Sequence, residues 1–468
     1  MYTEMFAVAA SALLLAGCCC SPEKKNAAEA ADGKYAVRLI TLDPGHFHAA
    51  LVQKFANADI SPVVHVYAPE NGFDLQAHLK RIQEFNTREK EPTSWKEEVY
   101  TGKDFLQRMI AERKGNVVVL AGNNSRKTEY ILASVKAGFN VLADKPMAIT
   151  PKDLELLREA YRVAKEKGVV LYDIMTERYE ITTMLQRELA RDPELYGKQE
   201  TGTQNDPAVT KESVHHFCKL VNGVPLQRPE WYYDTDQQGE AIVDVTTHLT
   251  DLVQWEVWPG VTLQPGDAKV LSARVWPTDI TFAQYQKNTS AKAWPSYLKS
   301  KLDKDGNLPC MANGEYTWNL KGVFAKVSVL WNFEPEAGSG DTHYSLMRGT
   351  KCSLVIEQGQ AEGFKPVLYV EPRRNVAGVT RETVGAALKN AIAKLQATWP
   401  GVSYEPFETG FRINVPAKYH NGHEQHFAQV MAKYIGFIKD PKSMPAWEIP
   451  DILVKYQTLM DAYKMSRE

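Results

Sequence analysis

The sequence reads VRLITL at residues 37–42 and DPGHFH at residues 43–48. A largely apolar run of this length, without alternation, is typical of a strand that is buried on both faces of a parallel sheet. The polar turn ends the strand, and residues 49–55 predict the helix that follows it. The folded part of the chain therefore begins with a strand, a turn and a helix.

Units of this kind repeat up to residue 174. Further strands are predicted at 63–67, 117–120, 141–143 and 169–174, and helices near 105–110, 128–135 and 151–164. Repeated βα units predict an α/β fold with a doubly wound, parallel sheet of the Rossmann type. Such sheets bind ligands beyond the carboxyl ends of their strands. In this sequence those ends carry the polar turns 43–48, 122–124 and 144–146.

The second half of the chain has a different pattern. In residues 325–333 the apolar side chains alternate with polar ones, which is typical of an antiparallel sheet with one solvated face. Strands are also predicted at 269–276, 352–357 and 366–370, and helices at 382–396, 424–438 and 450–464, while 284–312 show no clear element. We therefore expect a dinucleotide-binding domain at 35–178 and an α+β domain with a mostly antiparallel open sheet at 179–468.

The N-terminus predicts export. Residues 6–15 are apolar but too few to span a membrane, and they lead into Leu15-Ala16-Gly17-Cys18. This sequence resembles the lipobox of bacterial lipoproteins, in which the cysteine is lipidated. We expect a signal peptide with a lipobox at 1–20, lipidation of Cys18, and a tether at 21–34. The protein would then be anchored in the cell envelope, facing the periplasm or the cell surface.

Composition excludes several classes of protein. The chain has 468 residues and a formal net charge of -2, so it lacks the basic surface that nucleic-acid binding needs. Beyond the predicted leader it has three cysteines, Cys218, Cys310 and Cys352, an odd number that does not indicate a disulfide framework. No CxxC pair occurs, which argues against a zinc site with thiolate ligands.

Two short stretches carry residues suited to catalysis. Lys145, in Asp144-Lys145-Pro146, follows a strand and could stabilise an alkoxide on a substrate oxygen. Asp244 and His248 are four residues apart, so on a helix they would share one face, where His248 could act as a general base. The alternatives are a surface lysine at a turn and a structural cluster of polar side chains on a helix.

These stretches also carry a family resemblance. The chain resembles the Gfo/Idh/MocA oxidoreductases, which include glucose–fructose oxidoreductase and inositol dehydrogenase, in Asn123-Asn124, Asp144-Lys145-Pro146, Glu177-Arg178-Tyr179 and the GxAxxDxxxH pattern at 239–248. The resemblance implies that Lys145, Asp244 and His248 are catalytic. It implies that Asn123, Asn124 and Lys145 flank the nicotinamide ribose, with Arg178 near nicotinamide and substrate. The chain departs from the family in Asp144, usually Glu, and in a glycine-rich loop reduced to Gly45.

Further residues are expected in the binding sites. Glu70 follows the second strand, where an acid binds ribose hydroxyls, and this favours NAD over NADP. The remaining residues expected to bind the cofactor are Gly45, His46, Phe47, His48 and Asp144. Substrate-binding residues are expected to be Arg178, Tyr179, His216, Trp231, Asp244 and His248. A zinc site formed by His46, His48, His215 and His216 is conceivable, but we expect no metal.

The expected function is hydride transfer between a ring carbon of a sugar or glycoside and a tightly bound NAD(P). Export favours a redox-neutral cycle, because free NAD is scarce outside the cytoplasm. One alternative is NAD-dependent cleavage of a glycoside through a keto intermediate. Another is a non-enzymatic carbohydrate-binding lipoprotein on a decayed oxidoreductase scaffold. The expected partners are a carbohydrate, a membrane contacted through the lipid anchor, and a second copy of the chain bound through the second-domain sheet; nucleic acid is not expected.

Overall fold

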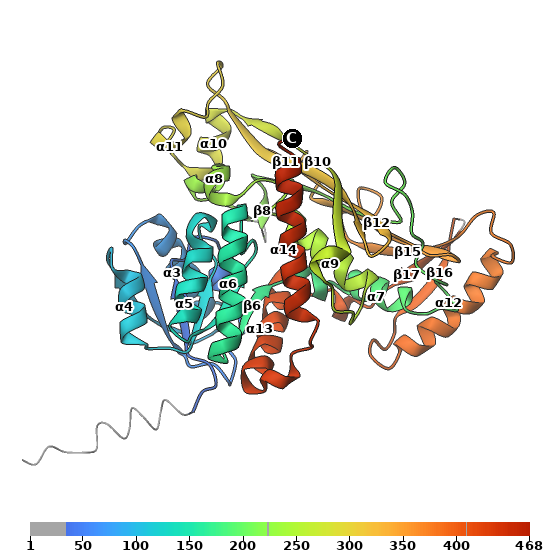
Figure 1. Ribbon diagram of the computed structural model, residues 1–468, viewed down its shortest axis with the longest axis horizontal. Coiled ribbons are helices and arrows are strands. Elements are labelled where there is room, and N and C mark those ends of the chain that lie inside the picture. The colour runs from blue at the N-terminus through green and yellow to red at the C-terminus, as the bar shows by residue number, and fades with distance from the viewer. Residues whose placement is uncertain (1–33, 222–223, 409) are drawn as a thin grey trace, which may run out of the picture.

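A computed structural model describes residues 34–221, 224–408 and 410–468 (Figure 1). The first domain contains a six-stranded, fully parallel sheet in the order β3-β2-β1-β4-β5-β6, which is the Rossmann order. Its strands are β1 (Leu39–Leu42), β2 (Val63–Ala68), β3 (Lys96–Thr101), β4 (Val117–Leu120), β5 (Asn140–Asp144) and β6 (Leu171–Ile174). All four residues of β1 and of β4 are buried, so the predicted doubly wound α/β fold is confirmed.

Helices cover this sheet on both faces. They are α2 (His48–Leu51), α3 (Phe73–Thr87), α4 (Phe105–Glu112), α5 (Lys127–Lys136) and α6 (Pro151–Lys167). α6 begins at a capping box, in which Thr150 and Asp153 bond each other's backbone N–H groups. The helix predicted at 49–55 is shorter than expected, because α2 ends at Leu51.

The second domain contains a nine-stranded sheet in the order β10-β11-β12-β7-β13-β14-β15-β17-β16. Its strands are β7 (Val209–His216), β10 (Ala268–Ile280), β11 (Leu308–Leu320), β12 (Val323–Asn332), β13 (Thr342–Arg348), β14 (Cys352–Gln358), β15 (Val367–Pro372), β16 (Ser403–Phe407) and β17 (Gly410–Asn414). β12 pairs with β7 in parallel, and the other neighbours are antiparallel. The expectation of a mostly antiparallel sheet is confirmed.

The remaining elements connect or cover these two sheets. A separate hairpin is formed by β8 (Leu220–Val221) and β9 (Val224–Pro225). The helices are α7 (Ile181–Ala190), α8 (Thr235–Gln238), α9 (Thr246–Val257), α10 (Phe282–Thr289), α11 (Ser296–Lys299), α12 (Arg381–Leu395), α13 (His423–Lys439) and α14 (Glu448–Met465). Short 3-10 helices are η1 (Asn124–Arg126), η2 (Thr176–Tyr179), η3 (Glu230–Tyr233), η4 (Pro265–Asp267), η5 (Ala417–Tyr419) and η6 (Pro441–Ser443). Residues 284–312 thus contain helical turns that the sequence did not indicate.

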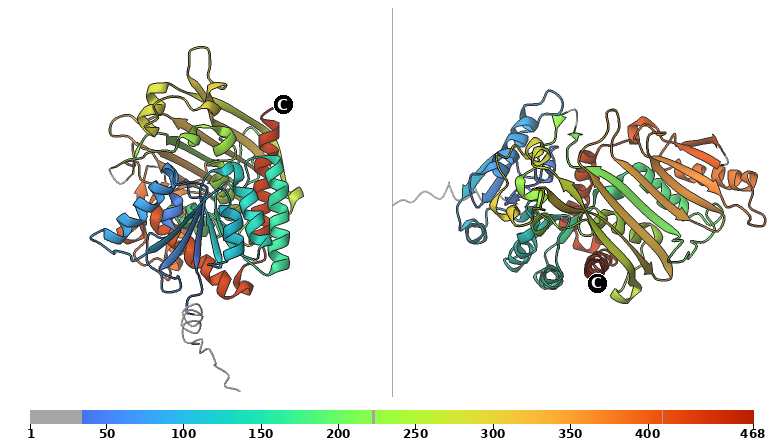
Figure 2. Two further views of the ribbon diagram at one scale, coloured as in Figure 1. Left: turned by 90° about the vertical axis from the view of Figure 1, so that its left-hand side faces the viewer. Right: turned by 90° about the horizontal axis from the view of Figure 1, so that it is seen from above.

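The C-terminal helices return to the first domain. Figures 1 and 2 show α14 standing between the two domains, with α13 beside β6. Lys455 on α14 is fully buried, and its Nζ contacts Asp173 of β6 at 2.6 Å and Asp251 of α9 at 2.9 Å. A buried ion-pair network therefore joins the two domains, in addition to the chain itself, which passes from the first domain to the second near residue 178.

No helix within the described ranges is long and apolar enough to cross a membrane. The predicted signal peptide, Cys18 and the tether up to residue 33 lie outside the described residues.

Candidate active site

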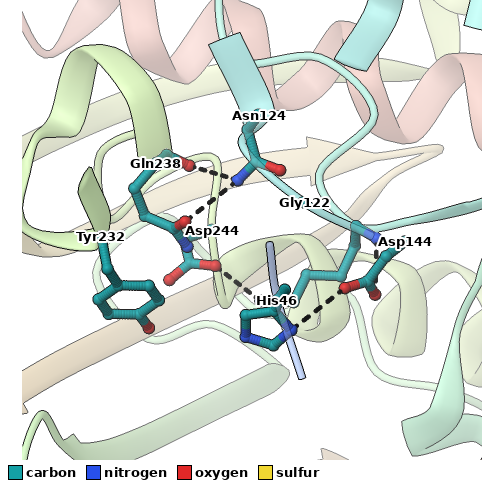
Figure 3. A pocket seen from close by; sticks show the side chains of 8 residues that line it. His46, Gly122, Asn124, Asp144, Tyr232, Gln238 and Asp244 are labelled. Carbon is teal, nitrogen blue, oxygen red and sulfur yellow. Dashed lines mark hydrogen bonds and ion pairs between the residues drawn. The ribbon is translucent and has the colours of Figure 1, made fainter. Parts of the chain in front are cut away.

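The carboxyl ends of β1, β4 and β5 face the segment that carries η3, α8 and α9. Loops of the first domain meet closely here, since a Cβ on Gly122 would lie 2.2 Å from the carbonyl oxygen of Asp43. Beside this contact is a small pocket (Figure 3). Its lining is almost entirely polar and comes from both domains: His46, Gly122, Asn124, Asp144, Lys145, Tyr232, Gln238 and Asp244.

An ion pair crosses the pocket from one domain to the other. Lys145 Nζ lies 2.6 Å from Asp244 Oδ1, and the side chains are only 12% and 8% exposed. A second lysine, Lys127 at the start of α5, is buried beneath the pocket and donates to the Asp144 carbonyl oxygen at 3.1 Å. Burial lowers the pKa of Lys127 to about 8. The site thus holds a largely buried ammonium group, that of Lys145, which can stabilise negative charge on a substrate oxygen.

His248 lies in the first turn of α9 and is buried. Its Nδ1 has no hydrogen-bond partner among the described residues. Burial, followed by the nearby Lys145 charge, holds the pKa of His248 well below its usual value of 6.5, so the imidazole is neutral and can accept a proton. Asp244 precedes α9, which begins at Thr246, and its carboxylate pairs with Lys145. The expected common helical face of Asp244 and His248 is therefore not formed.

Three histidines and an aspartate form a second polar cluster beside the pocket. His48 Nδ1 lies 2.9 Å from Asp144 Oδ2, and His46 Nδ1 lies 3.7 Å from the same oxygen. On the other side of the His48 ring, Nε2 lies 3.1 Å from Nε2 of His423, at the start of α13. Burial raises the pKa of the Asp144 carboxyl, but His48 and Lys127 outweigh it and hold this pKa well below the usual range.

The inner part of the site suits the nicotinamide end of a dinucleotide. Asn123 Nδ2 donates to Gln237 Oε1 at 2.7 Å, and Asn124 Nδ2 donates to the Gln238 carbonyl oxygen at 2.7 Å, so both asparagines reach the second domain. Asn124 Oδ1 is buried without a partner in the described chain and remains available as an acceptor. With Lys145 beside it, the Asn124 side chain can bind the ribose and the carboxamide of a nicotinamide nucleotide.

The outer part of the site is closed where a Rossmann domain usually binds pyrophosphate. The N–H groups of Gly45 and His46 both donate to the Ala121 carbonyl oxygen, at 3.2 and 3.0 Å. Trp231 covers Gly45, and its Nε1 donates to Asp74 Oδ2 at 2.7 Å. A Cβ on Gly45 would lie 3.1 Å from both side chains. A dinucleotide thus fits this site only if Trp231 moves away from the loop.

Acidic side chains around the closed part also disfavour a pyrophosphate. Asp74 is largely buried, and burial raises the pKa of its carboxyl to about 6, with Asp43 and Glu70 contributing to the rise. Glu70 is exposed just after β2, as the sequence indicated. At neutral pH these carboxylates repel an anion. Phe47 packs its ring against those of His46 and His48 and offers no polar group.

Arg178 does not reach the pocket, in contrast to the expectation that it lies near nicotinamide and substrate. Its guanidinium is buried and bonds both carboxylate oxygens of Asp251, at 2.6 and 2.7 Å, and Glu448 at 3.1 Å. Tyr179 is partly buried against the core, and His216 bonds Asp341 at 2.8 Å. Neither is part of the pocket lining. Because all three guanidinium nitrogens of Arg178 bond carboxylates inside the protein, this residue stabilises the interface between the two domains.

Several pocket residues were not anticipated from the sequence. Gln238 lines the pocket from the segment before α9, and Lys127 donates to the carbonyl oxygen of Asp144, another lining residue. Glu177 lies near Lys145 and His423, and burial raises the pKa of its carboxyl to about 7, with Glu180 adding to the rise. Glu177 could have been selected from the sequence, because it stands next to Arg178 in the Glu177-Arg178-Tyr179 motif. His423 is 375 residues from His48, and no local pattern links them.

The fold and the polar site at the domain interface define a two-domain oxidoreductase of the Rossmann class. Residues 45–173 match the family model described as "Oxidoreductase family, NAD-binding Rossmann fold", and residues 185–467 match "Putative oxidoreductase C terminal domain". The chain belongs to the Gfo/Idh/MocA family of oxidoreductases.

Solved structures agree with this assignment. A protein from Parabacteroides merdae ATCC 43184, described as a "putative oxidoreductase", is 49% identical, with a TM-score of 0.89 over 92% of this chain and 98% of that one. More distant structures share the fold. One from Thermotoga maritima is 15% identical, with a TM-score of 0.59 over 92% of this chain and 98% of that chain. Levoglucosan dehydrogenase, in complex with NADH and levoglucosan, is 13% identical, with a TM-score of 0.55 over 92% and 98% of the two chains. Among curated proteins, no sequence matches the chain.

Proposed function

We propose that the protein is an NAD(P)-dependent oxidoreductase that acts on a hydroxyl group of a carbohydrate. The observation that carries this proposal is the buried 2.6 Å pair of Lys145 and Asp244 in a pocket lined almost entirely by polar groups, with the neutral His248 buried nearby but outside the lining. A dense polar lining suits a ligand rich in hydroxyl groups. The fold similarity to a dehydrogenase bound to NADH and levoglucosan supports the same substrate class.

Each residue of this set has a distinct task. Lys145 Nζ binds the substrate oxygen and stabilises the alkoxide that forms there. Asp244 holds Lys145 across the pocket, at 2.6 Å, and keeps its ammonium group oriented. His248 accepts the hydroxyl proton, since its imidazole is neutral. A bound nicotinamide, held by Asn124 and Lys145, would supply the acceptor for the hydride that leaves the carbon.

Trp231→Ala should strengthen the binding of NADH by at least about tenfold, which corresponds to about 1.4 kcal/mol. The reason is that Trp231 occupies the space over Gly45 and must be displaced by a dinucleotide. Titration followed by nicotinamide fluorescence, with NADPH alongside, measures the effect and decides between NAD and NADP. Glu70 at the end of β2 favours NAD.

Trp276→Ala, on β10, is the matched control and should leave NADH affinity unchanged. Lowering the pH from about 8 to about 5.5 should strengthen binding to the unmodified protein, because the raised pKa of Asp74, about 6, lets this carboxyl become neutral. Equal affinity of the wild type and Trp231→Ala at every pH would show that Trp231 does not occupy the nucleotide position.

A panel of free sugars and glycosides, assayed with less cofactor than enzyme, tests the reaction. We propose a redox-neutral cycle, so many turnovers per bound nucleotide are expected, with only transient reduction of the nicotinamide. One oxidised sugar per nucleotide, followed by arrest, would instead require an external acceptor. Release of the aglycone from glycosides would identify cleavage through a keto intermediate. Absence of any turnover on the panel, with nucleotide bound, would contradict the proposed activity.

The closed pyrophosphate position favours a second candidate function. Because the N–H groups of Gly45 and His46 are already bonded to Ala121, the chain could bind a carbohydrate without a nucleotide. Calorimetry separates the two proposals. Sugar binding without any NAD(P) binding, in the wild type and in Trp231→Ala alike, would support the non-enzymatic carbohydrate-binding protein.

We also propose that the protein is exported, lipidated at Cys18 and held at the cell envelope, and that it forms homo-oligomers through the second-domain sheet. The lipobox-like sequence at residues 15–18 supports the first part. Growth with a labelled fatty acid should mark the wild type, whereas Cys18→Ser should remain unlabelled. Equal labelling of both would exclude Cys18 as the anchor. Light scattering of the purified chain measures its oligomeric state.

A further inference from the structure

The turn after β1 and the end of β5 bring three potential metal ligands together. His46, His48 and Asp144 each offer one ligand atom, and these three atoms lie within 4.8 Å of one another. His46 and Asp144 also line the pocket, and Figure 3 shows their side chains pointing toward each other. His215 and His216, the other histidines considered for a zinc site, contact Asp341 in the second domain at 3.3 and 2.8 Å.

The spacing of these atoms matches that of ligands around one metal ion. Two ligands about 2.1 Å from a tetrahedral zinc ion lie about 3.4 Å apart. The observed distances to Asp144 Oδ2, 2.9 Å from His48 and 3.7 Å from His46, lie on either side of this value. We propose that His46 Nδ1, His48 Nδ1 and Asp144 Oδ2 form a site for a divalent transition metal, with zinc as the best match.

The surrounding hydrogen bonds favour this use of Asp144 and His48, while His46 Nδ1, 3.4 Å from the His48 backbone N–H, would exchange that contact for the metal ion. The backbone N–H of Lys145 donates to Asp144 Oδ1 at 3.0 Å, which leaves Oδ2 for a metal ion. With a metal on Nδ1, His48 carries its proton on Nε2 and donates it to His423 Nε2, 3.1 Å away. Metal-bound histidines usually donate their second N–H in this way, and the partner fixes the ring orientation. His423 is thus a positioning residue for the metal site.

The ligand set indicates both the metal and its use. Two imidazoles and one carboxylate suit zinc and similar first-row metals better than calcium or magnesium, which prefer oxygen ligands. Three protein ligands leave a coordination position open, as in catalytic zinc sites. Since His46 and Asp144 line the pocket, that position can take an oxygen atom of the substrate and polarise it. Metal binding itself does not depend on the proposed oxidoreductase function.

The test measures metal content rather than activity. The full chain is stripped with a chelator, incubated with one equivalent of Zn²⁺, desalted, and analysed by mass spectrometry for metals. The wild type should retain close to one zinc per chain, and its melting temperature should rise by several degrees when zinc is added, because zinc binds the folded state. His46→Ala and His48→Ala should lose both effects. Cobalt substitution should give the visible bands of a tetrahedral site.

Matched variants separate ligands from other histidines. His65→Ala, on β2 and outside the cluster, should retain zinc as the wild type does. His423→Gln should still bind zinc, with a dissociation constant about 10- to 100-fold higher, as for a lost partner of a metal-bound histidine. Less than a tenth of an equivalent in the wild type would overturn the proposal. So would equal zinc retention by the wild type and by a folded His46→Ala.

Discussion

Lys145→Met should reduce turnover by about 10²- to 10³-fold, because it removes the cation that stabilises the alkoxide on the substrate. The Lys145 side chain is 12% exposed and its Nζ is paired with Asp244 at 2.6 Å, so the charge lies in a partly desolvated site, where its effect on a developing oxyanion is large. The loss should fall mainly on kcat, since the alkoxide exists in the transition state and not in the bound substrate. Steady-state kinetics on the best sugar of the panel measures it.

Two variants control this experiment. Lys136→Met removes an exposed lysine that pairs with Glu159 on α6, and turnover should stay unchanged. Lys145→Arg keeps the charge and should recover part of the lost activity. Wild-type kcat in a folded Lys145→Met would remove this residue from the mechanism.

Arg178→Met should lower the free energy of unfolding by about 3–5 kcal/mol, the range for breaking a buried ion pair. The substitution leaves two carboxylates, those of Asp251 and Glu448, without the guanidinium that bonds both of them inside the protein. Lys455 and Lys433 keep one contact each to these carboxylates, so the fold should survive at low denaturant. The midpoint of urea unfolding, followed by tryptophan fluorescence, measures the change.

Arg126→Met is the matched control, because its ion pair with Glu129 is more than half exposed and its loss should leave the unfolding midpoint almost unchanged. NADH affinity separates the two possible roles of Arg178. A structural role predicts unchanged affinity in the folded variant. A stable Arg178→Met with strongly weakened NADH binding would instead return this residue to the cofactor site.

The sequence predicted those elements of the fold whose patterns are imposed by burial. The apolar run at 37–42 and the alternating apolar and polar residues at 325–333 both lie in strands of the structure, because each pattern reflects which faces of the strand are buried. β3 was missed because it is an edge strand of sequence KEEVYT, mostly exposed and without an apolar face. α2 is shorter than predicted, and the preceding Gly45 and His46 N–H groups bond the Ala121 carbonyl oxygen.

The candidate site was predictable where a motif and a strand end coincide. Lys145 could be selected in this way and Asp244 from the GxAxxDxxxH pattern, and the structure joins them across the interface. Arg178 could not be assigned correctly, because a sequence does not show that Asp251 and Glu448 surround it. His423 could not be linked to His48 either, since only the path of α13 beside the first domain brings them together.

The position of α14 has a consequence for how the protein is made. Its Tyr456 hydroxyl accepts a hydrogen bond from the Met147 backbone N–H, two residues after Lys145, and its Lys455 ties β6 to α9. These contacts come from α14, which follows all the strands of both sheets along the chain. Both sheets are therefore synthesised before the helix that fixes the loop of Lys145. Activity should arise only once α14 has packed between the domains, and products that end before residue 448 should be inactive.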